Sequence, residues 1–178
     1  MTAAITPGPN NIILSTHAVN YGFKETVPLI LGVFFGFLSI LTISLLGLGK
    51  IYHSFPTVAM IIKIIAVGFL TYLSFKIFNS KNSKKFTFKD IYFFQIINPK
   101  GMTMAMSSSA IFLQNEFPYY IEFILIFSCF IISTASSAIA WAAIGHLFKK
   151  YLNDTKKIIY FNRIMAILLL SSIVIIVL

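Results

Sequence analysis

The sequence predicts an all-α polytopic membrane protein of six transmembrane helices, arranged as two inverted three-helix repeats with a short first helix. Three observations lead to this fold class. Of the 178 residues, 58% are hydrophobic and only 11% are charged, whereas soluble domains carry about 25% charged residues. Six continuous apolar stretches divide the chain, and helix-breaking residues recur at matching places in its two halves. The composition excludes a soluble enzyme, a disordered tail and a disulfide scaffold.

The six apolar stretches are long enough to cross a bilayer, which takes about 20 residues per helix. They are continuous rather than alternating, so we expect helices and not the strands of a barrel. Because they leave no room for a soluble domain, residues 1–178 form a single transmembrane domain. Repeat one covers about residues 1–78, a basic loop covers 79–90, and repeat two covers 91–178. The stretches are residues 1–19, 27–49, 58–78, 91–113, 120–145 and 158–178.

The first stretch is broken near its start by Pro7, Gly8 and Pro9, which are followed by Asn10. Two prolines around a glycine remove backbone donors and cannot continue an α-helix. At a rise of about 1.5 Å per residue, the stretch measures roughly 28 Å, barely one hydrocarbon thickness. We therefore expect either that the true start lies upstream of Met1 or that the first half-helix is stunted, which puts activity in doubt.

The second stretch, residues 27–49, contains no charged residue. Gly32 and Gly36 lie four residues apart within it, a spacing that favours close packing against another helix. The third stretch carries Lys63 near its predicted outer end. We interpret this lysine as one whose long side chain extends to the membrane interface.

The fourth stretch, residues 91–113, is broken by Asn98, Pro99, Lys100 and Gly101. A lysine this deep in an apolar stretch is costly unless it faces a wet cavity or a partner. We interpret Lys100 as an anchor for a substrate carboxylate, or as a charge that switches its state within a cavity. The alternative is a lysine that only extends to the interface.

The fifth and sixth stretches, residues 120–145 and 158–178, contain no proline and predict uninterrupted helices. Glu122 lies near the outer end of the fifth stretch, where we expect it to face water. The serines and threonines of the fifth stretch are compatible with close packing or with a polar path, and the sequence leaves both open.

The two breaks occupy corresponding positions, because each falls in the leading helix of a three-helix half. Three is an odd number, so the second half must run with the opposite orientation. In transporters built from inverted repeats, such discontinuous helices form the substrate site near the bilayer midplane. The positive end of a half-helix suits a carboxylate and the carbonyl end suits an ammonium group. A zwitterionic amino acid needs both, although Pro and Gly also simply kink membrane helices.

The basic residues indicate topology, and the net charge of +9 does not indicate nucleic-acid binding here. Loops one, three and five with their edges hold 11 of the 14 bases, and the positive-inside rule places these loops in the cytoplasm. Both termini are then predicted to lie outside. These bases are Lys24, Lys76, Lys81, Lys84, Lys85, Lys89, Lys149, Lys150, Lys156, Lys157 and Arg163.

Neither a metal site nor enzyme chemistry is predicted. The three histidines are scattered, and no metal-binding motif or pairing of a nucleophile with a base is present in the sequence. No cofactor is therefore expected. His17, which follows the first break, and Lys100 are the candidates for proton coupling.

At these positions the chain resembles the LysE/RhtB family of amino-acid export proteins. The family motif residues correspond to Pro7, Gly8, Pro9, Asn10, Asn98, Pro99 and Lys100, with further matches at Tyr21-Gly22-Phe23, Gly32, Tyr72-Leu73-Ser74-Phe75-Lys76 and Phe94-Gln95. The resemblance implies a multi-pass secondary carrier in the bacterial cytoplasmic membrane, exporting amino acids or close derivatives with the proton gradient. The Phe94-Gln95 step resembles the branch that exports cysteine, O-acetylserine and other neutral amino acids. The implied partners are an amino-acid substrate and the lipid bilayer. The resemblance leaves open whether the protein forms a homo-oligomer.

The chain departs from the family pattern in ways that bear on coupling. Asn10 stands where many relatives have an acid, and Phe37 follows Gly36 where many have an aspartate. We therefore expect no carboxylate in the cavity, so that coupling falls to His17, Lys100 or the substrate itself. The alternatives to an exporter are a non-transporting membrane assembly or stabilising subunit, or an inactive N-terminally truncated family member.

Overall fold

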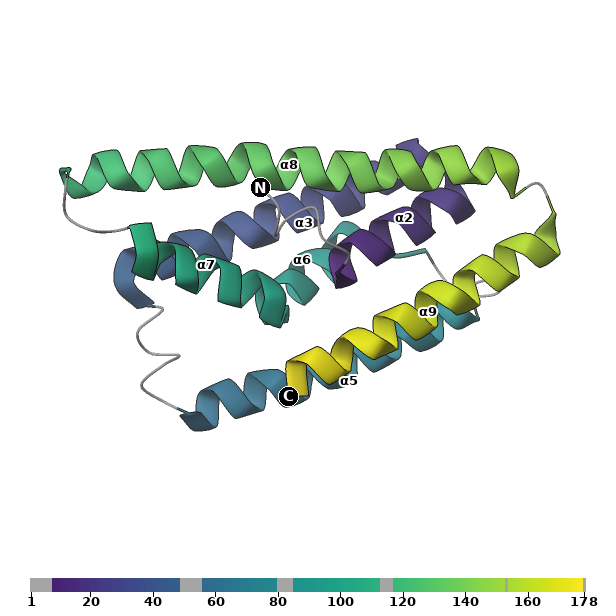
Figure 1. Ribbon diagram of the computed structural model, residues 1–178, viewed down its shortest axis with the longest axis horizontal. Coiled ribbons are helices and arrows are strands. Elements are labelled where there is room, and N and C mark those ends of the chain that lie inside the picture. Colours follow the sequence, from purple (N-terminus) through teal and green to yellow (C-terminus); the bar gives the residue numbers. More distant parts are fainter. Residues whose placement is uncertain (1–7, 49–55, 80–84, 113–116, 153, 178) are drawn as a thin grey trace.

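The computed structural model describes residues 8–48, 56–79, 85–112, 117–152 and 154–177. Within these ranges the chain is helical and contains no strand, which confirms the all-α class (Figure 1). The elements are α2 (Pro9–Tyr21), α3 (Phe23–Ile43), the π-helical turn η1 (Ser44–Leu48), α5 (Pro56–Phe78), α6 (Phe88–Ile97), α7 (Pro99–Phe112), α8 (Tyr119–Tyr151) and α9 (Thr155–Val177).

Four of the described helical segments are long and apolar enough to cross a membrane. They are Phe23–Gly47, Met60–Phe78, Tyr119–Tyr151 and Thr155–Val174, and they match the second, third, fifth and sixth expected stretches. The two stretches with breaks form shorter helices, since α2 has 13 residues, α6 has 10 and α7 has 14. The described helices thus establish four candidate spans of the six expected.

Helices α6 and α8 extend beyond the predicted stretches for local reasons. Helix α6 begins at Phe88 because Thr87 and Asp90 form a capping box, in which the Asp90 carboxylate accepts from Thr87 N at 2.8 Å. Helix α8 continues past Gly145 to Tyr151. Its last turn carries Lys149 and Lys150, whose positive charges suit the negative end of a helix.

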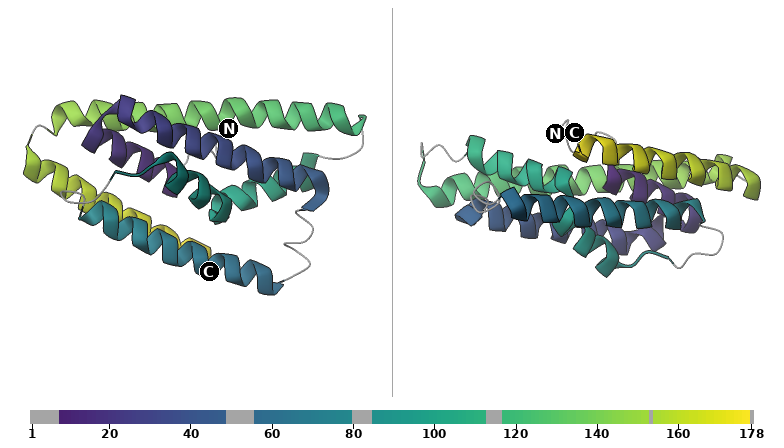
Figure 2. Two further views of the ribbon diagram at one scale, coloured as in Figure 1. Left: turned by 180° about the vertical axis from the view of Figure 1, so that it is seen from behind. Right: turned by 90° about the horizontal axis from the view of Figure 1, so that it is seen from below.

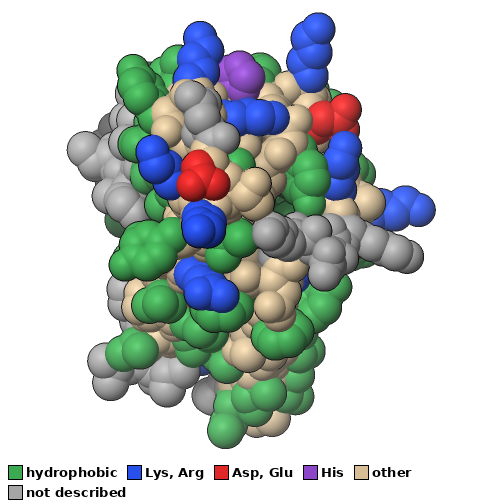
Figure 3. All heavy atoms as spheres, turned by 90° about the vertical axis from the view of Figure 1, so that its right-hand side faces the viewer, with side chains coloured by type: hydrophobic (Ala, Val, Ile, Leu, Met, Phe, Trp, Pro, Cys, Tyr) green, Lys and Arg blue, Asp and Glu red, His purple; other side chains and the backbone are tan. Residues whose placement is uncertain are grey.

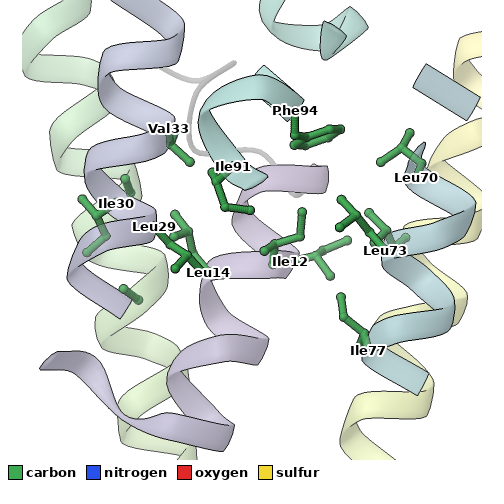
Figure 4. Close-up of a cluster of buried hydrophobic side chains, with 14 of the residues drawn as sticks. Ile12, Leu14, Leu29, Ile30, Val33, Leu70, Leu73, Ile77, Ile91 and Phe94 are labelled. Carbon is green, nitrogen blue, oxygen red and sulfur yellow. The ribbon is translucent and has the colours of Figure 1, made fainter. Parts of the chain in front are cut away.

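The helices form two groups that meet through α2 and α6. The long helix α8 lies along α3 and α2, and α5 pairs with α9 on the opposite side (Figures 1 and 2). The other extensive contact joins α3 to α6. Figure 4 shows the buried cluster between the groups, in which the labelled side chains come from α2, α3, α5 and α6. It includes Ile12, Leu14, Leu29, Val33, Leu70, Leu73, Ile91 and Phe94.

Glycines allow the closest of these helix contacts. A Cβ at Gly32 would lie 2.9 Å from Phe88 O, and one at Gly36 would lie 2.7 Å from the Cβ of Gln95. The prediction that Gly32 and Gly36 pack closely against another helix is confirmed, and the partner is α6. On α8, a Cβ at Gly145 would overlap the backbone of Ser15. Small residues let membrane helices approach each other so closely.

Basic side chains gather at the end of the molecule where α2 and α8 finish and α9 begins (Figure 3). Lys85 forms an ion pair of 3.1 Å with Glu25, so the third loop meets the start of α3. Lys76 lies 4.1 Å above the ring of Phe86. Bases that are distant in the sequence therefore share one end of the fold, as expected if they share one side of a membrane.

The expectation that Glu122 faces water is wrong. Its side chain is 5% exposed, and its Oε1 accepts a hydrogen bond of 3.3 Å from Phe117 N. The carboxylate bonds to the chain just before α8 begins, where a negative charge is favoured. This local bond turns the side chain inward.

Candidate functional site

The predicted break in the fourth stretch lies at Asn98. Helix α6 ends at Ile97, Asn98 is extended with φ −70° and ψ 109°, and α7 begins at Pro99. Proline disfavours helical geometry in the residue before it and is well suited to the first position of a helix. The Oδ1 of Asn98 accepts from Lys100 N at 3.2 Å and so caps α7. The break is thus explained by the residues that predicted it.

The described part of the first stretch begins at its break. Gly8 is extended with φ −163° and ψ 173°, and α2 starts at Pro9. The first helical hydrogen bond runs from Ile12 N to Gly8 O at 3.0 Å. Pro7, the first of the predicted site residues, lies outside the described residues.

The two breaks meet in space although they are far apart in the sequence. The side chain of Lys100 lies against the backbone of Gly8, where an added Cβ would be 2.9 Å from Lys100 Nζ and 3.1 Å from its Cδ. The N-termini of α2 and α7 therefore converge around one lysine. Two positive helix ends and an ammonium group together favour an anion at this point.

Gln95 joins the two breaks and was not among the predicted site residues. Its side chain is 1% exposed, and its Oε1 accepts from Asn10 Nδ2 at 2.6 Å and from Asn98 Nδ2 at 3.2 Å. The sequence held one signal for it: a glutamine in an apolar stretch, three residues before Asn98 and hence on the same helix face.

A small cavity of about 50 Å³ lies at this junction. Gly8, Pro9, Asn10, Asn98 and Lys100 line it, so it brings together most of the predicted site, whereas Pro99 is not among its lining residues. The remaining described residues of the lining are Asn11, Val33, Phe37, Gln95, Gly101, Met104, Thr134, Ser137 and Ala138, none of them acidic. Helix α8 thus contributes hydroxyl groups to the cavity, beside the amides of the breaks.

His17 lies apart from this cavity, since it is not among the lining residues. It is 2% exposed, and its Nδ1 is 3.0 Å from the hydroxyl of Thr26. Because that hydroxyl donates to Gly22 O at 2.9 Å, we infer that His17 Nδ1 donates to Thr26. Of the two candidates for proton coupling, only Lys100 reaches the cavity.

One helical turn after His17, a pair of asparagines joins α2 to α9. The amide of Asn20 donates to Asn162 Oδ1 at 2.9 Å, and the amide of Asn162 donates back to Asn20 Oδ1 at 3.0 Å. Asn162 is 1% exposed. This reciprocal pair holds α2 and α9 together at the end of the molecule where the basic residues gather.

The acidic residues in the described ranges form hydrogen bonds or ion pairs at helix ends and in loops. Glu25 pairs with Lys85, Asp90 caps α6, Glu122 bonds to Phe117 N, and Asp154 accepts from Lys156 N at 3.0 Å. Within those ranges, no three His, Cys, Asp or Glu residues lie together as a metal site would require.

Comparison with known proteins assigns the chain to a family. The family model for the LysE type translocator matches residues 1–174. A cysteine/O-acetylserine efflux protein of Escherichia coli O139:H28 (strain E24377A / ETEC) is 22% identical over 178 residues, covering 96% of this chain and 89% of the relative. The proteins of the same name from Escherichia coli (strain K12) and Shigella flexneri serotype 5b (strain 8401) are 22% identical over 177 residues, covering 95% of this chain and 89% of each relative.

No solved structure matches the chain significantly. The family match spans nearly the whole sequence and includes both breaks, the cavity and the four candidate spans. The chain therefore belongs to the LysE-type translocator family and is a multi-pass membrane transporter, not an enzyme.

Proposed function

We propose that the protein is a secondary carrier that exports amino acids or close derivatives across the bacterial cytoplasmic membrane. The substrate is held between the broken helices, at the cavity where α2 and α7 begin. The observation that carries the proposal is the contact of Lys100 with Gly8, because it unites two helix N-termini and a cation at one small polar cavity.

The chemistry of this junction suits the carboxylate of an amino acid. The partial positive charges of two helix N-termini add to the charge of the Lys100 ammonium group. A lysine inside an apolar bundle is stabilised when an anion and polar groups surround it. The amides of Asn10 and Asn98 and the hydroxyl of Thr134 supply polar groups around the same cavity.

The architecture we propose for this carrier has six spans in two inverted repeats. Helix α2 belongs to the first span, and α6 with α7 forms the fourth. Exchange of the two halves interchanges the contact of α2 with α8 and the contact of α3 with α6, and maps the pair of α5 and α9 onto itself. Glycines allow close approach in the contact of α2 with α8 and in the contact of α3 with α6. This correspondence supports the internal symmetry.

The proposed orientation places the end with the basic residues in the cytoplasm and both termini outside. The Asn20–Asn162 pair then closes the cytoplasmic end between α2 and α9. A cavity of about 50 Å³ has room for only a few water molecules. The helices around it must therefore move to admit an amino acid, as alternating access requires.

The test of this function is efflux from vesicles that contain only the purified protein. The vesicles are loaded with a panel of radiolabelled amino acids and assayed with and without a pH gradient. Cysteine and O-acetylserine come first, because the relatives are named for their efflux. Efflux of at least one amino acid supports a carrier, and no efflux of any would support a non-transporting subunit or an inactive protein instead.

Lys100→Ala is expected to abolish this efflux while membrane expression is retained, because the variant removes the cation that faces the substrate carboxylate. Lys63→Ala is the matched control, since Lys63 is an exposed lysine of α5 that does not line the cavity. Unchanged efflux by Lys100→Ala would contradict the proposed site.

A further inference from the structure

We propose that Gln95 is a positioning residue that orients the Asn10 amide, so that Asn10 Oδ1 accepts the substrate's ammonium group. The inference rests on the proposed export of amino acids and extends it to the second charge of the substrate. Gln95 acts through Asn10, and Asn10 makes the contact with the substrate.

The orientation of the Asn10 amide follows from its hydrogen bond. Asn10 Nδ2 donates to Gln95 Oε1 at 2.6 Å, which fixes the nitrogen side of the amide against α6. Asn10 Oδ1 is buried and has no hydrogen-bond partner among the described residues. A buried acceptor without a donor is unfavourable. Since Asn10 lines the cavity, a donor on the substrate would satisfy this oxygen.

Gln95 is itself held in one position by the elements around it. Its Oε1 also accepts from Asn98 Nδ2 at 3.2 Å. A Cβ at Gly36 would lie 2.7 Å from the Cβ of Gln95, and a Cβ at Gly101 would lie 2.7 Å from its Nε2. The glycines of α3 and α7 thus leave the space that this side chain fills. An acceptor clamped in this way imposes its direction on the amide of Asn10.

The two ends of a zwitterion then have separate partners in one cavity. Lys100 and the two helix N-termini bind the carboxylate. Asn10 Oδ1 accepts a hydrogen bond from the ammonium group. Sites built to hydrogen-bond a polar group reject analogues that lack it, because the buried partner is left unpaired. We therefore expect strong preference for an amino acid over its analogue without the amino group.

The experiment compares Gln95→Met with Gln95→Glu in the vesicle assay, using the amino acid that the wild-type protein exports and the matching carboxylic acid without the amino group. Methionine has a similar length but no strong acceptor, so Asn10 loses its orientation. We expect KM for the amino acid to rise at least tenfold, Vmax to change less than KM, and the preference over the carboxylic acid to fall at least tenfold.

Glutamate keeps an oxygen that accepts from Asn10 and Asn98, so Gln95→Glu is expected to recover most of the affinity that Gln95→Met loses. Asn10→Ala is expected to reproduce the loss, and adding Gln95→Met to it should have little further effect, because both act through one hydrogen bond. Thermal melting of each purified variant identifies one that fails to fold, and Asn10→Ala and Gln95→Glu then carry the test.

The outcomes separate this inference from the proposed function. If the wild-type protein exports the amino acid and Gln95→Met leaves its KM and its preference over the carboxylic acid unchanged, the role of Gln95 is overturned and the proposed export function is retained. Asn10→Ala replaces Gln95→Met in this comparison if the latter does not fold. Equal losses for both substrates would assign Gln95 a merely structural role and also overturn the inference. Absence of efflux of any amino acid by the wild-type protein would overturn the proposed function and this inference with it.

Discussion

Lys100 lies against Gly8 because glycine is the residue that leaves room for a lysine at the start of α2. The backbone of Gly8 is extended, a conformation open to any residue, so the need for glycine comes from the neighbour and not from strain. Lys100 itself is half-buried and lies in the first turn of α7. The position of this cation is therefore set by two short motifs that each start a helix.

Gly8→Ala tests the contact at the scale of one methyl group. The added Cβ would lie 2.9 Å from Lys100 Nζ, and the flexible end of the lysine can move aside. We therefore expect efflux to fall severalfold while stability falls by no more than about 1 kcal/mol, the usual cost of alanine at an N-cap. Initial rates and melting temperatures measure the two effects. Gly68→Ala is the control, because its Cβ would meet nothing within 4 Å and should leave efflux intact. Equal effects of both variants would contradict the contact.

Some of the site residues can be predicted from the sequence and others cannot. Asn10, Asn98 and Lys100 were predicted because amides, prolines and a lysine inside apolar stretches are conspicuous. The sequence marks Gln95 only through a family resemblance, although it is a polar residue in the same stretch as Asn98. Hydropathy alone does not predict the buried position of Glu122, because the bond from Phe117 N that turns it inward depends on how the chain enters α8.

At the scale of helices, the close approach of α2 and α8 brings the first break against α8. Helix α2 is buried along most of its length, and its contact with α8 is among the most extensive in the fold. Gly145 makes the approach possible, because a side chain there would occupy the space of the Ser15 backbone. The helix that carries Thr134 and Ser137 is thereby brought against the N-terminal break.

Gly145→Ala is expected to destabilise the protein by about 1–3 kcal/mol, the usual cost of an extra methyl group in a packed core. The obstacle is the backbone of Ser15, which cannot rotate away as a side chain could. Thermal unfolding of the purified protein in detergent measures the loss, with Gly68→Ala as a matched helical control. A melting temperature equal to that of the wild-type protein would show that α2 and α8 are not so close.

At the scale of the whole molecule, α2 and α9 contact each other at the end where the basic residues gather. Figures 1 and 2 show α9 and α5 as a pair that approaches α2 at this end. The reciprocal amide bonds of Asn20 and Asn162 lie in this contact. If export requires access from the cytoplasm, these two helices must part during each cycle.

Cross-linking tests that movement. Cysteines are introduced by Asn20→Cys and Asn162→Cys in a Cys129→Ala background, which removes the native cysteine. A short thiol cross-linker that joins them is expected to reduce efflux at least tenfold, and cleavage of the linker should restore it, because α2 and α9 can then separate again. The single-cysteine variants treated in the same way are the controls. Full efflux by the cross-linked protein would place the moving contact elsewhere.

The sequence by itself determined the helical membrane class, four of the expected spans and the position of the breaks. These features are local, because hydropathy accumulates along a stretch and proline and glycine end a helix wherever they stand. Even the capping box of Thr87 and Asp90 could be recognised from its spacing.

Only the tertiary structure decided that Gln95 joins the two breaks and that His17 lies apart from the cavity. These relations depend on which helix faces pack together, and residues such as Asn10 and Gln95 are 85 positions apart. Packing is set by the fit of whole helices, including the gaps left by Gly36 and Gly145, and no local pattern encodes that fit.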